Sequence, residues 1–317
     1  MTVDKLRVGV LGLGKIAHIA QLPSLAEMED VRIVAAHSRT RKSMEFAASK
    51  YNIEKLCDTF EQFLKTDMDC AFILTPKETH CEYALQLLHK GIDVFCEKPL
   101  GMTLGECRQL VEAAEAGGRI LMVGFNRRYA PVYRKVKETF GDNPPHVVIA
   151  QKNRNGTEYR ATLENAIHMV DLLRWFCGEP VDIQANCAYT DNMHEDYTTA
   201  QIRFDSGSSG ILVASRKAGQ WVEKLDAYGD YHSVFVNAPD NVMVADAEQE
   251  VSTNLTALAV GWPRVEDKMG FRQEVEHFVD CVRKRAQPLT SGEDAYKTHL
   301  LVHEILTKAG LPGIDGE

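Results

Sequence analysis

Short apolar runs alternate with amphipathic stretches along the first 125 residues. The runs, at 6–11, 31–36, 70–74, 92–96 and 120–123, are bounded by Gly, Asp or Pro. Because they are apolar on both faces, they are typical of buried strands in a parallel sheet. Helical patterns lie between them, at 43–50, 78–90 and 104–116. This alternation predicts an α/β, doubly wound Rossmann domain over residues 1–125.

The pattern changes after Pro131. A strand at 147–152 and a helix at 163–177 precede longer alternating runs at 185–189, 198–204, 210–215, 225–228 and 233–236. Such runs predict a largely antiparallel, open sheet with one solvated or partner-facing side. We interpret 238–267 as a loop with one short strand, followed by helices at 271–285 and 292–308. The second domain, 126–317, is therefore α+β, and its terminal helices could pack back on the first domain.

The charge and the cysteines exclude several classes of function. The net charge of −9 argues against nucleic acid as a partner, because phosphate binding requires a basic surface. No window approaches 18 consecutive apolar residues, and residues 1–10 do not resemble a signal peptide, so we expect a cytoplasmic protein without membrane contact. The eight cysteines are scattered without a C-x-x-C pair. We therefore expect reduced thiols and no zinc site.

A G-x-G-x-x-A motif follows the first predicted strand and opens a helix. It consists of Gly12, Leu13, Gly14, Lys15, Ile16 and Ala17. The first glycine permits a tight turn, the second lets the backbone approach a pyrophosphate, and the small third residue allows close helix–sheet packing. The helix N-terminus adds free N–H groups for the phosphates. In this strand–turn–helix context we predict a dinucleotide site rather than a simple turn.

The end of the second predicted strand favours one cofactor. NAD-binding domains carry an acidic residue there for the ribose 2′-hydroxyl, whereas this chain has Ser38 and Arg39. Ser38 can donate a hydrogen bond, and Arg39 can pair with a phosphate or stack beside the adenine. The basic residues could also be only a solvated helix start. We expect NADP to be preferred, with NAD as the alternative.

Several segments in a fixed order carry a family resemblance. They are Thr75-Pro76 with His80, Glu97-Lys98-Pro99, Asn126-Arg127-Arg128-Tyr129, Glu164 with His168 and Asp171, 271–280 and 291–295. Over essentially the whole chain, this set resembles the Gfo/Idh/MocA oxidoreductase family, which includes glucose–fructose oxidoreductase and inositol dehydrogenase. The segments 125–131 and 270–274 look closest to the MviM-like branch of that family.

The resemblance implies hydride transfer between a nicotinamide cofactor and the hydroxyl or carbonyl of a sugar, sugar derivative or cyclitol. It also implies a homodimer or homotetramer formed through the open sheet. By motif, Lys98 is the catalytic lysine and His168 the substrate-side histidine. Thr75, Pro76, His80 and Glu97 would line the nicotinamide half of the cofactor groove, while Asn126 and Arg127 would approach cofactor or substrate. Similar proteins often have a cis peptide bond corresponding to Lys98–Pro99.

Physical chemistry supports the same roles. Alcohol oxidation needs a base for the hydroxyl proton, and a lysine that ends a parallel strand lies in the crevice where ligands bind such sheets. Glu164, His168, Asp171 and Trp175 are spaced i, i+4, i+7 and i+11, so we expect them on one helix face, with carboxylates orienting the histidine. Asp171 and Arg174 would form a structural pair on the helix surface.

Two features leave the function open. Many family members have Asp four residues before the histidine, and Glu164 keeps the carboxylate with one methylene more. The extra methylene could preserve the role, mark a different substrate or mark a relaxed site. The alternative function is a catalytically silent, dinucleotide-dependent sensor of the same fold. A third hypothesis keeps the hydride chemistry and changes the substrate to an imine or a bilin.

Overall fold

The structure of this chain is a computed structural model, and it describes residues 5–156, 159–188, 194–256, 261 and 264–315. The chain divides into two compact units. The first comprises Met1–Phe125, Val265–Asp267 and Phe271–Tyr296. The second comprises Asn126–Arg264, Lys268–Gly270 and Lys297–Glu317.

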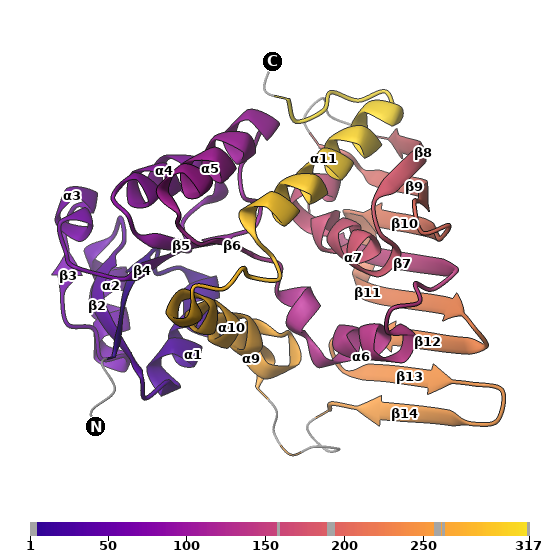
Figure 1. Cartoon of the computed structure of the whole chain (residues 1–317), viewed down its shortest axis with the longest axis horizontal. Coiled ribbons are helices and arrows are strands. Elements are labelled where there is room, and N and C mark those ends of the chain that lie inside the picture. Colours follow the sequence, from indigo (N-terminus) through magenta and orange to yellow (C-terminus); the bar gives the residue numbers. More distant parts are fainter. Residues whose placement is uncertain (1–4, 157–158, 189–193, 257–260, 262–263, 316–317) are drawn as a thin grey trace. The chain divides into compact units, whose positions relative to one another are not determined.

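Six parallel strands form the sheet of the first unit, in the order β3-β2-β1-β4-β5-β6 (Figure 1). They are β1 (Leu6–Leu11), β2 (Val31–His37), β3 (Leu56–Cys57), β4 (Cys70–Ile73), β5 (Asp93–Glu97) and β6 (Leu121–Gly124). The order reverses between β1 and β4, and ligands of such sheets bind outside the carboxyl ends of the strands at that point. The predicted doubly wound parallel sheet is confirmed.

Helices pack on this sheet through apolar side chains. They are the π-helical segment η1 (Ala17–Gln21), α1 (Leu22–Glu27), α2 (Arg41–Lys50), α3 (Phe60–Leu64), α4 (His80–His89), α5 (Leu104–Gly117) and α10 (Phe271–Lys284). The 3₁₀ turn η2 (Lys77–Thr79), which buries none of its residues, precedes α4. Helix α10 comes from the distant C-terminal segment. It belongs to this unit because Phe278 packs edge-on against Phe72 of β4 and Phe95 of β5, at centroid distances of 5.2 and 5.7 Å.

The second unit contains an eight-stranded sheet in the order β14-β13-β12-β11-β7-β10-β9-β8. Its strands are β7 (Val147–Asn155), β8 (Pro180–Ala188), β9 (Tyr197–Phe204), β10 (Ser209–Ser215), β11 (Lys217–Gly229), β12 (His232–Asn237), β13 (Asn241–Ala245) and β14 (Glu250–Asn254). Strands β7 and β10 are parallel, and the other neighbours are antiparallel. The prediction of a largely antiparallel sheet is confirmed, although residue 189 of one expected strand lies outside the described residues.

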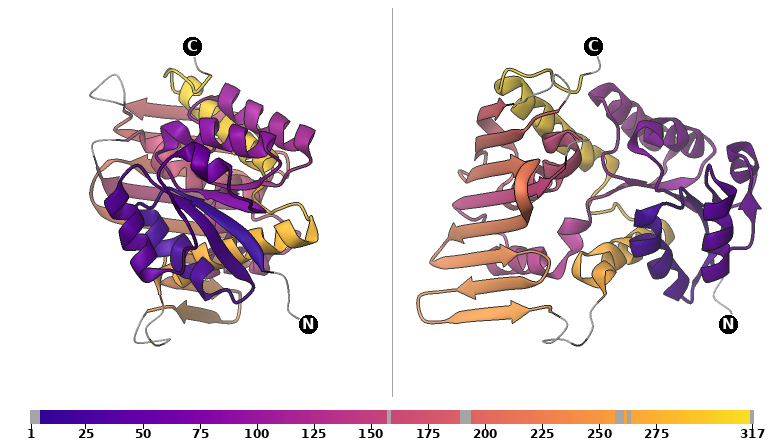
Figure 2. Two further views of the ribbon diagram at one scale, coloured as in Figure 1. Left: turned by 90° about the vertical axis from the view of Figure 1, so that its left-hand side faces the viewer. Right: turned by 180° about the vertical axis from the view of Figure 1, so that it is seen from behind.

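One face of this sheet is covered by helices. The 3₁₀ turn η3 (Asn126–Tyr129), α6 (Pro131–Phe140), the π-helical segment η4 (Ala161–Ala166) and α7 (Ile167–Cys177) lie on it, as Figure 2 shows edge-on. Strand β9 follows this arrangement, because Thr198, Ala200, Ile202 and Phe204 are buried while the residues between them are more exposed. Helices α9 (Val265–Lys268) and α11 (Gly292–Lys308) each begin in the first unit and end in the second.

Two local expectations were wrong. The region 238–267 contains the hairpin β13–β14 rather than one short strand. Every residue of β14 is exposed, so the strand lacks the alternation of buried and exposed residues by which a sequence pattern reveals a strand. The helix expected at 163–177 begins earlier, at Ala161, and its first segment is π-helical rather than α-helical.

Candidate active site

The glycine-rich loop lies between the ends of β1 and β4. Gly12 has a φ of +88°, and a Cβ there would lie 2.5 Å from the carbonyl oxygen of Leu74. Only glycine fits this conformation and this close approach. A Cβ on Gly14, by contrast, would meet no atom within 4 Å. The loop therefore has the two properties of a pyrophosphate cradle: a tight turn, and open space above the second glycine.

A cavity of about 520 Å³ lies beside this loop. Of the residues predicted to bind the cofactor, Gly12, Leu13, Gly14, Ser38, Arg39, Thr75 and Pro76 line it. Lys15, Ile16 and Ala17 lead from the loop into η1, where the Ala17 side chain is fully buried. The cavity thus collects residues from the ends of β1, β2 and β4, which is where a dinucleotide binds in this fold.

The part of the cavity beside the end of β2 is more basic than acidic. Ser38 and Arg39 directly follow β2, and the Arg39 side chain is exposed. The neighbouring Arg41 pairs with Glu45 and Asp58 at 3.0 and 2.7 Å. Among the described residues that line the cavity, Glu78 is the one carboxylate, and it lies on η2 beyond β4.

Lys98 directly follows β5, the neighbour of β4 in the sheet, and is half-buried. Its peptide bond to Pro99 is cis, as predicted. The preceding carboxylate, that of Glu97, accepts a hydrogen bond from Nε2 of Gln21 at 2.6 Å and another from the backbone N–H of Lys98 at 3.3 Å. The Glu97 carboxylate thus links the start of the lysine segment to Gln21 of η1.

His80 connects this segment to the end of β4. Its Nδ1 lies 2.8 Å from the carbonyl oxygen of Pro99, and its Nε2 lies 3.0 Å from that of Thr75. The side chain is 1% exposed and does not line the cavity. Burial lowers the pKa of His80 and outweighs the two carbonyl contacts. The histidine joins Thr75, which lines the cavity, to the turn that carries Lys98.

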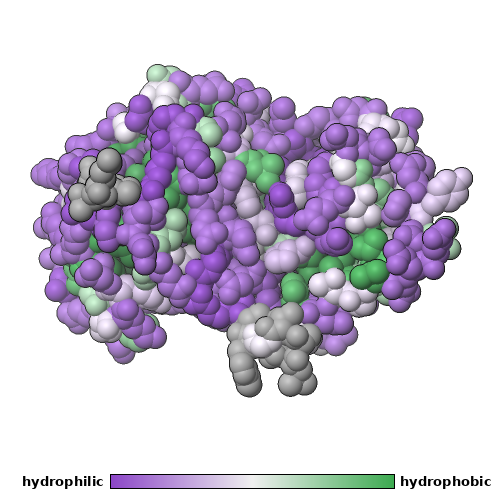
Figure 3. Space-filling view, turned by 60° about the horizontal axis from the view of Figure 1, so that its bottom comes forward, coloured by the Kyte–Doolittle hydropathy of each residue, from purple (hydrophilic) through white to green (hydrophobic). Residues whose placement is uncertain are grey.

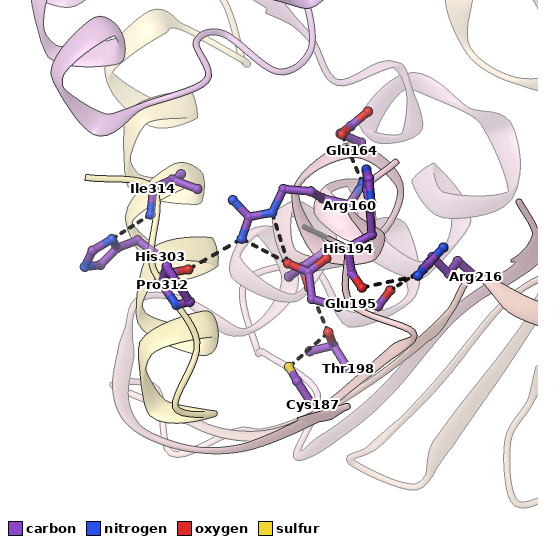
Figure 4. Close-up of polar contacts among 11 residues, drawn as sticks. Arg160, Glu164, Cys187, His194, Glu195, Thr198, Arg216, His303, Pro312 and Ile314 are labelled. Carbon is purple, nitrogen blue, oxygen red and sulfur yellow. Dashed lines mark hydrogen bonds and ion pairs between the residues drawn. The ribbon is translucent and has the colours of Figure 1, made fainter. Parts of the chain in front are cut away.

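Glu164 and His168 lie in the second unit, on η4 and on the first turn of α7. The Glu164 carboxylate accepts a hydrogen bond at 3.0 Å from the backbone N–H of Arg160, the residue before η4 (Figure 4). The Arg160 guanidinium pairs with the buried carboxylate of Glu195 at 3.0 Å. His168 is 5% exposed. Because a π-helix has i→i+5 hydrogen bonds, the 3.6-residue periodicity behind the shared-face prediction does not extend across Glu164.

Asn126 and Arg127 join a buried polar network in the second unit. The Arg127 guanidinium donates two hydrogen bonds to Glu223, each 2.9 Å long, and a third to Asn126. Glu223 also pairs with Lys152 and accepts from the Tyr133 hydroxyl at 3.0 Å. Burial by itself would raise the pKa of Glu223, but Arg127 and Lys152 hold it well below its ordinary value. The carboxylate is therefore ionised at neutral pH.

A second buried network crosses α7. Asp171 accepts two hydrogen bonds from the Arg128 guanidinium, at 2.8 and 2.6 Å, and one from the Thr298 hydroxyl at 3.0 Å. Arg174 pairs with Glu179 at 2.7 Å. We expected Asp171 and Arg174 on the exposed surface of the helix, and this was wrong. Both side chains are buried, and they bind Arg128 and Glu179, which lie outside α7. These contacts hold the helix that carries His168.

Two family models match the chain. The model for the Gfo/Idh/MocA oxidoreductase family, NAD-binding Rossmann fold, covers residues 6–125, and that for the GFO/IDH/MocA C-terminal domain covers residues 107–234. The chain belongs to the Gfo/Idh/MocA oxidoreductase family. As a Gfo/Idh/MocA protein it has an NAD-binding Rossmann domain, and its enzyme class is oxidoreductase.

Relatives extend the similarity over both units. The myo-inositol 2-dehydrogenase of Thermotoga maritima is 24% identical over 316 residues, which is 93% of this chain and 94% of the relative. The scyllo-inositol 2-dehydrogenase (NAD(+)) of Bacillus subtilis is 24% identical and covers 92% of this chain and 90% of its own. The crystal structure of the dehydrogenase MviM from Clostridium difficile is 26% identical, with a TM-score of 0.86 and coverage of 95% and 99%.

Neither a metal centre nor a membrane helix emerges from the described part of this Gfo/Idh/MocA protein. No group of three or more His, Cys, Asp or Glu side chains there could hold a metal ion. None of its helices is both long and apolar enough to cross a membrane. On the face drawn in Figure 3, hydrophilic residues predominate, and hydrophobic ones form small patches between them.

Sequence reasoning missed half of the cavity wall. His37, Thr40, Ser43, Leu74, Glu78, Thr79 and Tyr83 also line the cavity. A helical spacing could have revealed two of them, since Thr79 and Tyr83 follow Thr75 at i+4 and i+8. The Thr79 hydroxyl indeed donates to that of Thr75 at 2.8 Å. The others come from separate elements: His37 ends β2, Ser43 lies on α2, Glu78 lies on η2, and Leu74 and Thr40 lie in loops, so no single sequence spacing predicts a common face.

Proposed function

We propose that this chain transfers a hydride between a nicotinamide cofactor and the hydroxyl or carbonyl carbon of a sugar, sugar derivative or cyclitol. The observation that carries the proposal is the cavity at the β1–β4 switch point, lined by a glycine loop whose second glycine leaves room for a pyrophosphate. The inositol 2-dehydrogenases named above support the substrate class. The bound cofactor would supply or accept the hydride.

Lys98 is the acid/base in this proposal. It follows β5 at the carboxyl edge of the parallel sheet, where ligands of this fold bind. Its ammonium group would donate a proton to the oxygen of a carbonyl during reduction, and the neutral amine would take the hydroxyl proton during oxidation. The His80 contacts to Thr75 and Pro99 give the segment a defined position relative to the cavity wall.

His168 and Glu164 serve the substrate side. The His168 imidazole would bind a substrate hydroxyl, and Glu164 would keep the start of the helix in place through its bond to the Arg160 N–H. Glu164 has one methylene more than the Asp of many family members, and its carboxylate lies 3.0 Å from the Arg160 nitrogen. Arg127, whose guanidinium donates two hydrogen bonds to Glu223, would act by positioning Asn126 and the neighbouring backbone.

Within this proposal the preferred nicotinamide cofactor is NADP, with NAD as the alternative. Ser38 and Arg39 line the cavity, and neither can repel a 2′-phosphate. The Arg39 side chain is exposed and able to turn toward that phosphate. An NAD-binding residue would have to be a carboxylate at this strand end, and the chain has none at 37–43.

A homodimer or homotetramer is the assembly that the second unit favours. The sheet face opposite α6 and α7 carries Ile211, which is 36% exposed, next to Ile149 on the adjacent parallel strand. Exposed apolar side chains side by side on an open sheet face are typical of an association surface.

Cofactor consumption tests the proposal against the catalytically silent sensor. The purified protein is incubated with NADPH or NADH and pooled keto-sugars and inosose, and absorbance at the nicotinamide band is followed. An enzyme consumes the reduced cofactor only when substrate is present. Cofactor binding without turnover of any pool, including imine and bilin pools, would favour the sensor. Turnover of an imine or bilin pool alone would keep the chemistry and change the substrate.

A further inference from the structure

Arg154, the next-to-last residue of strand β7, packs against an aromatic ring. Its guanidinium carbon lies 4.2 Å from the centroid of the Tyr159 ring. The ring in turn lies against Gly156, where a Cβ would be 2.3 Å from Cε1 of the tyrosine. A glycine is thus required at 156 for the ring to reach this position. The result is a flat cationic surface with a fixed orientation.

Polar atoms of both side chains lack partners in the described part of the chain. Nε of Arg154 and the hydroxyl of Tyr159 are buried, and neither makes a hydrogen bond there. Tyr159 as a whole is 9% exposed. The ion pairs between described residues include no carboxylate on Arg154, although most other arginines of the second unit have one. Buried donors without acceptors are costly, so such a pair calls for a ligand.

The pair lies next to the proposed substrate residues of its own unit. Tyr159 precedes Arg160, whose backbone N–H donates to Glu164 (Figure 4). The Asn165 side chain donates to the carbonyl oxygen of Lys152 at 3.4 Å, which seats η4 on β7 two residues before Arg154. Arg154 shares with Lys152 the face of β7 that η4 and α7 cover, because alternate residues of a strand point to the same side.

We propose that Arg154 and Tyr159 bind an oxyanion, a carboxylate or a phosphate, carried by the substrate. This rests on the proposed function, because the pair lies beside the residues assigned to the substrate. The Arg154 fork would donate to two oxygens of the anion, and the Tyr159 hydroxyl would donate to the same group. The substrate class then narrows from neutral sugars and cyclitols to sugar acids or sugar phosphates.

Binding measurements with matched sugars test this. The protein, saturated with NADPH, is titrated calorimetrically with uronates and aldonates, with the 6-phosphates of the same sugars, and with the neutral parent sugars. We expect at least one anion to bind tenfold or more tightly than its neutral parent. A preference confined to the acids identifies a carboxylate, and one confined to the phosphates identifies a phosphate. No advantage for any anion in either panel would overturn the proposal.

Substitutions of Arg154 and Tyr159 test whether the anion binds at this pair. Arg154→Gln should abolish the advantage of the anion and leave the affinity for the neutral parent unchanged, whereas Arg134→Gln, at an exposed position of α6, should change neither. An equal loss for anion and parent in Arg154→Gln would mean a structural role and would overturn the proposal. Tyr159→Phe removes only the hydroxyl. It should weaken anion binding several-fold in a protein that keeps its fold, and an unchanged anion affinity would count against the site.

Turnover separates the two proposals. Oxidation or reduction of neutral sugars without any advantage for their acids or phosphates would overturn the oxyanion site and leave the proposed function standing. Anion binding that Arg154→Gln abolishes, without cofactor turnover in any panel, would contradict the oxidoreductase proposal and leave the oxyanion site standing.

Discussion

Gly12 faces the carbonyl oxygen of Leu74 so closely that a Cβ on the glycine would lie 2.5 Å from that oxygen. Gly14, two residues on, faces open space. The two glycines of one motif therefore serve different purposes. The first allows β1 and β4 to end side by side, and the second leaves room for a ligand.

Alanine at these two positions should have separable effects. Gly12→Ala places a side chain at a φ of +88° against the backbone, so it should cost at least about 1–3 kcal/mol of stability and lower cofactor affinity as well. Gly14→Ala should leave the midpoint of thermal unfolding nearly unchanged and weaken cofactor binding. Thermal unfolding and calorimetric titration with NADPH measure both effects. Equal loss of stability in the two variants would refute the assignment of Gly14 to the ligand.

Cofactor preference should depend on Arg39. Arg39→Asp sets a carboxylate against the 2′-phosphate and offers an acceptor to the ribose hydroxyl, so NADPH affinity should fall by about 10–100-fold while NADH affinity rises. Titration with each cofactor measures the change. The same charge reversal at the exposed Arg134 is the control and should affect neither affinity. Tighter binding of NADH than NADPH by the unaltered protein would contradict the NADP preference.

Lys98→Ala should slow turnover by about 10²–10⁴-fold, the usual size of an acid–base contribution. Lys98→Arg keeps the positive charge but holds its proton too tightly to exchange it, so it should be nearly as slow. Both variants should bind NADPH as the unaltered protein does, because the Gly12 loop and Ser38 are intact. Steady-state kinetics on a substrate from the pooled screen provides the test. Full activity in Lys98→Ala would make the lysine a structural residue.

Glu223 should stabilise the fold in a pH-dependent way. Arg127 and Lys152 hold its pKa below the unfolded value, so its contribution is present above about pH 4 and is lost as the pH falls below that. Glu223→Gln removes the buried negative charge that pairs with Arg127 and Lys152 and should cost about 3–5 kcal/mol. Urea unfolding at pH 7 and pH 3 measures both effects. Tyr133→Phe keeps the charges paired and should cost about 1 kcal/mol.

The open sheet face should carry the subunit interface. Ile211→Asp introduces a charge beside the apolar Ile149, so it should shift the assembly toward monomers at micromolar concentration. Sedimentation velocity measures this shift. Val265→Asp, at an exposed apolar position on α9, is the control and should leave the assembly unchanged. A monomer in the unaltered protein would contradict the proposed assembly itself.

Local patterns were sufficient for most elements of the fold. Five of the six strands of the parallel sheet were predictable because each is a short apolar run bounded by turn residues, and burial on both faces leaves no alternation. The sixth, β3, was not predicted, because its two residues are too few to form such a run. The helices α4, α5, α10 and α11 were predictable because one face of each is apolar at a 3.6-residue period. Short helices such as α3 and exposed strands such as β14 lack such periodicity, so tertiary neighbours decide them.

The candidate site likewise contains some residues that local patterns predict and others that only tertiary contacts bring together. The sequence by itself determined the glycine loop, the strand end that carries Lys98 and the basic residues after β2, because each is a local motif next to a recognisable strand. Only the tertiary structure decided that Arg127 binds Glu223, 96 residues away in the sequence. The same holds for the two carbonyl oxygens that the His80 ring contacts, and for the packing of the Arg154 guanidinium against the Tyr159 ring. Partner choice across such distances depends on which side chains the sheets and helices bring together, and no local pattern in the sequence encodes it.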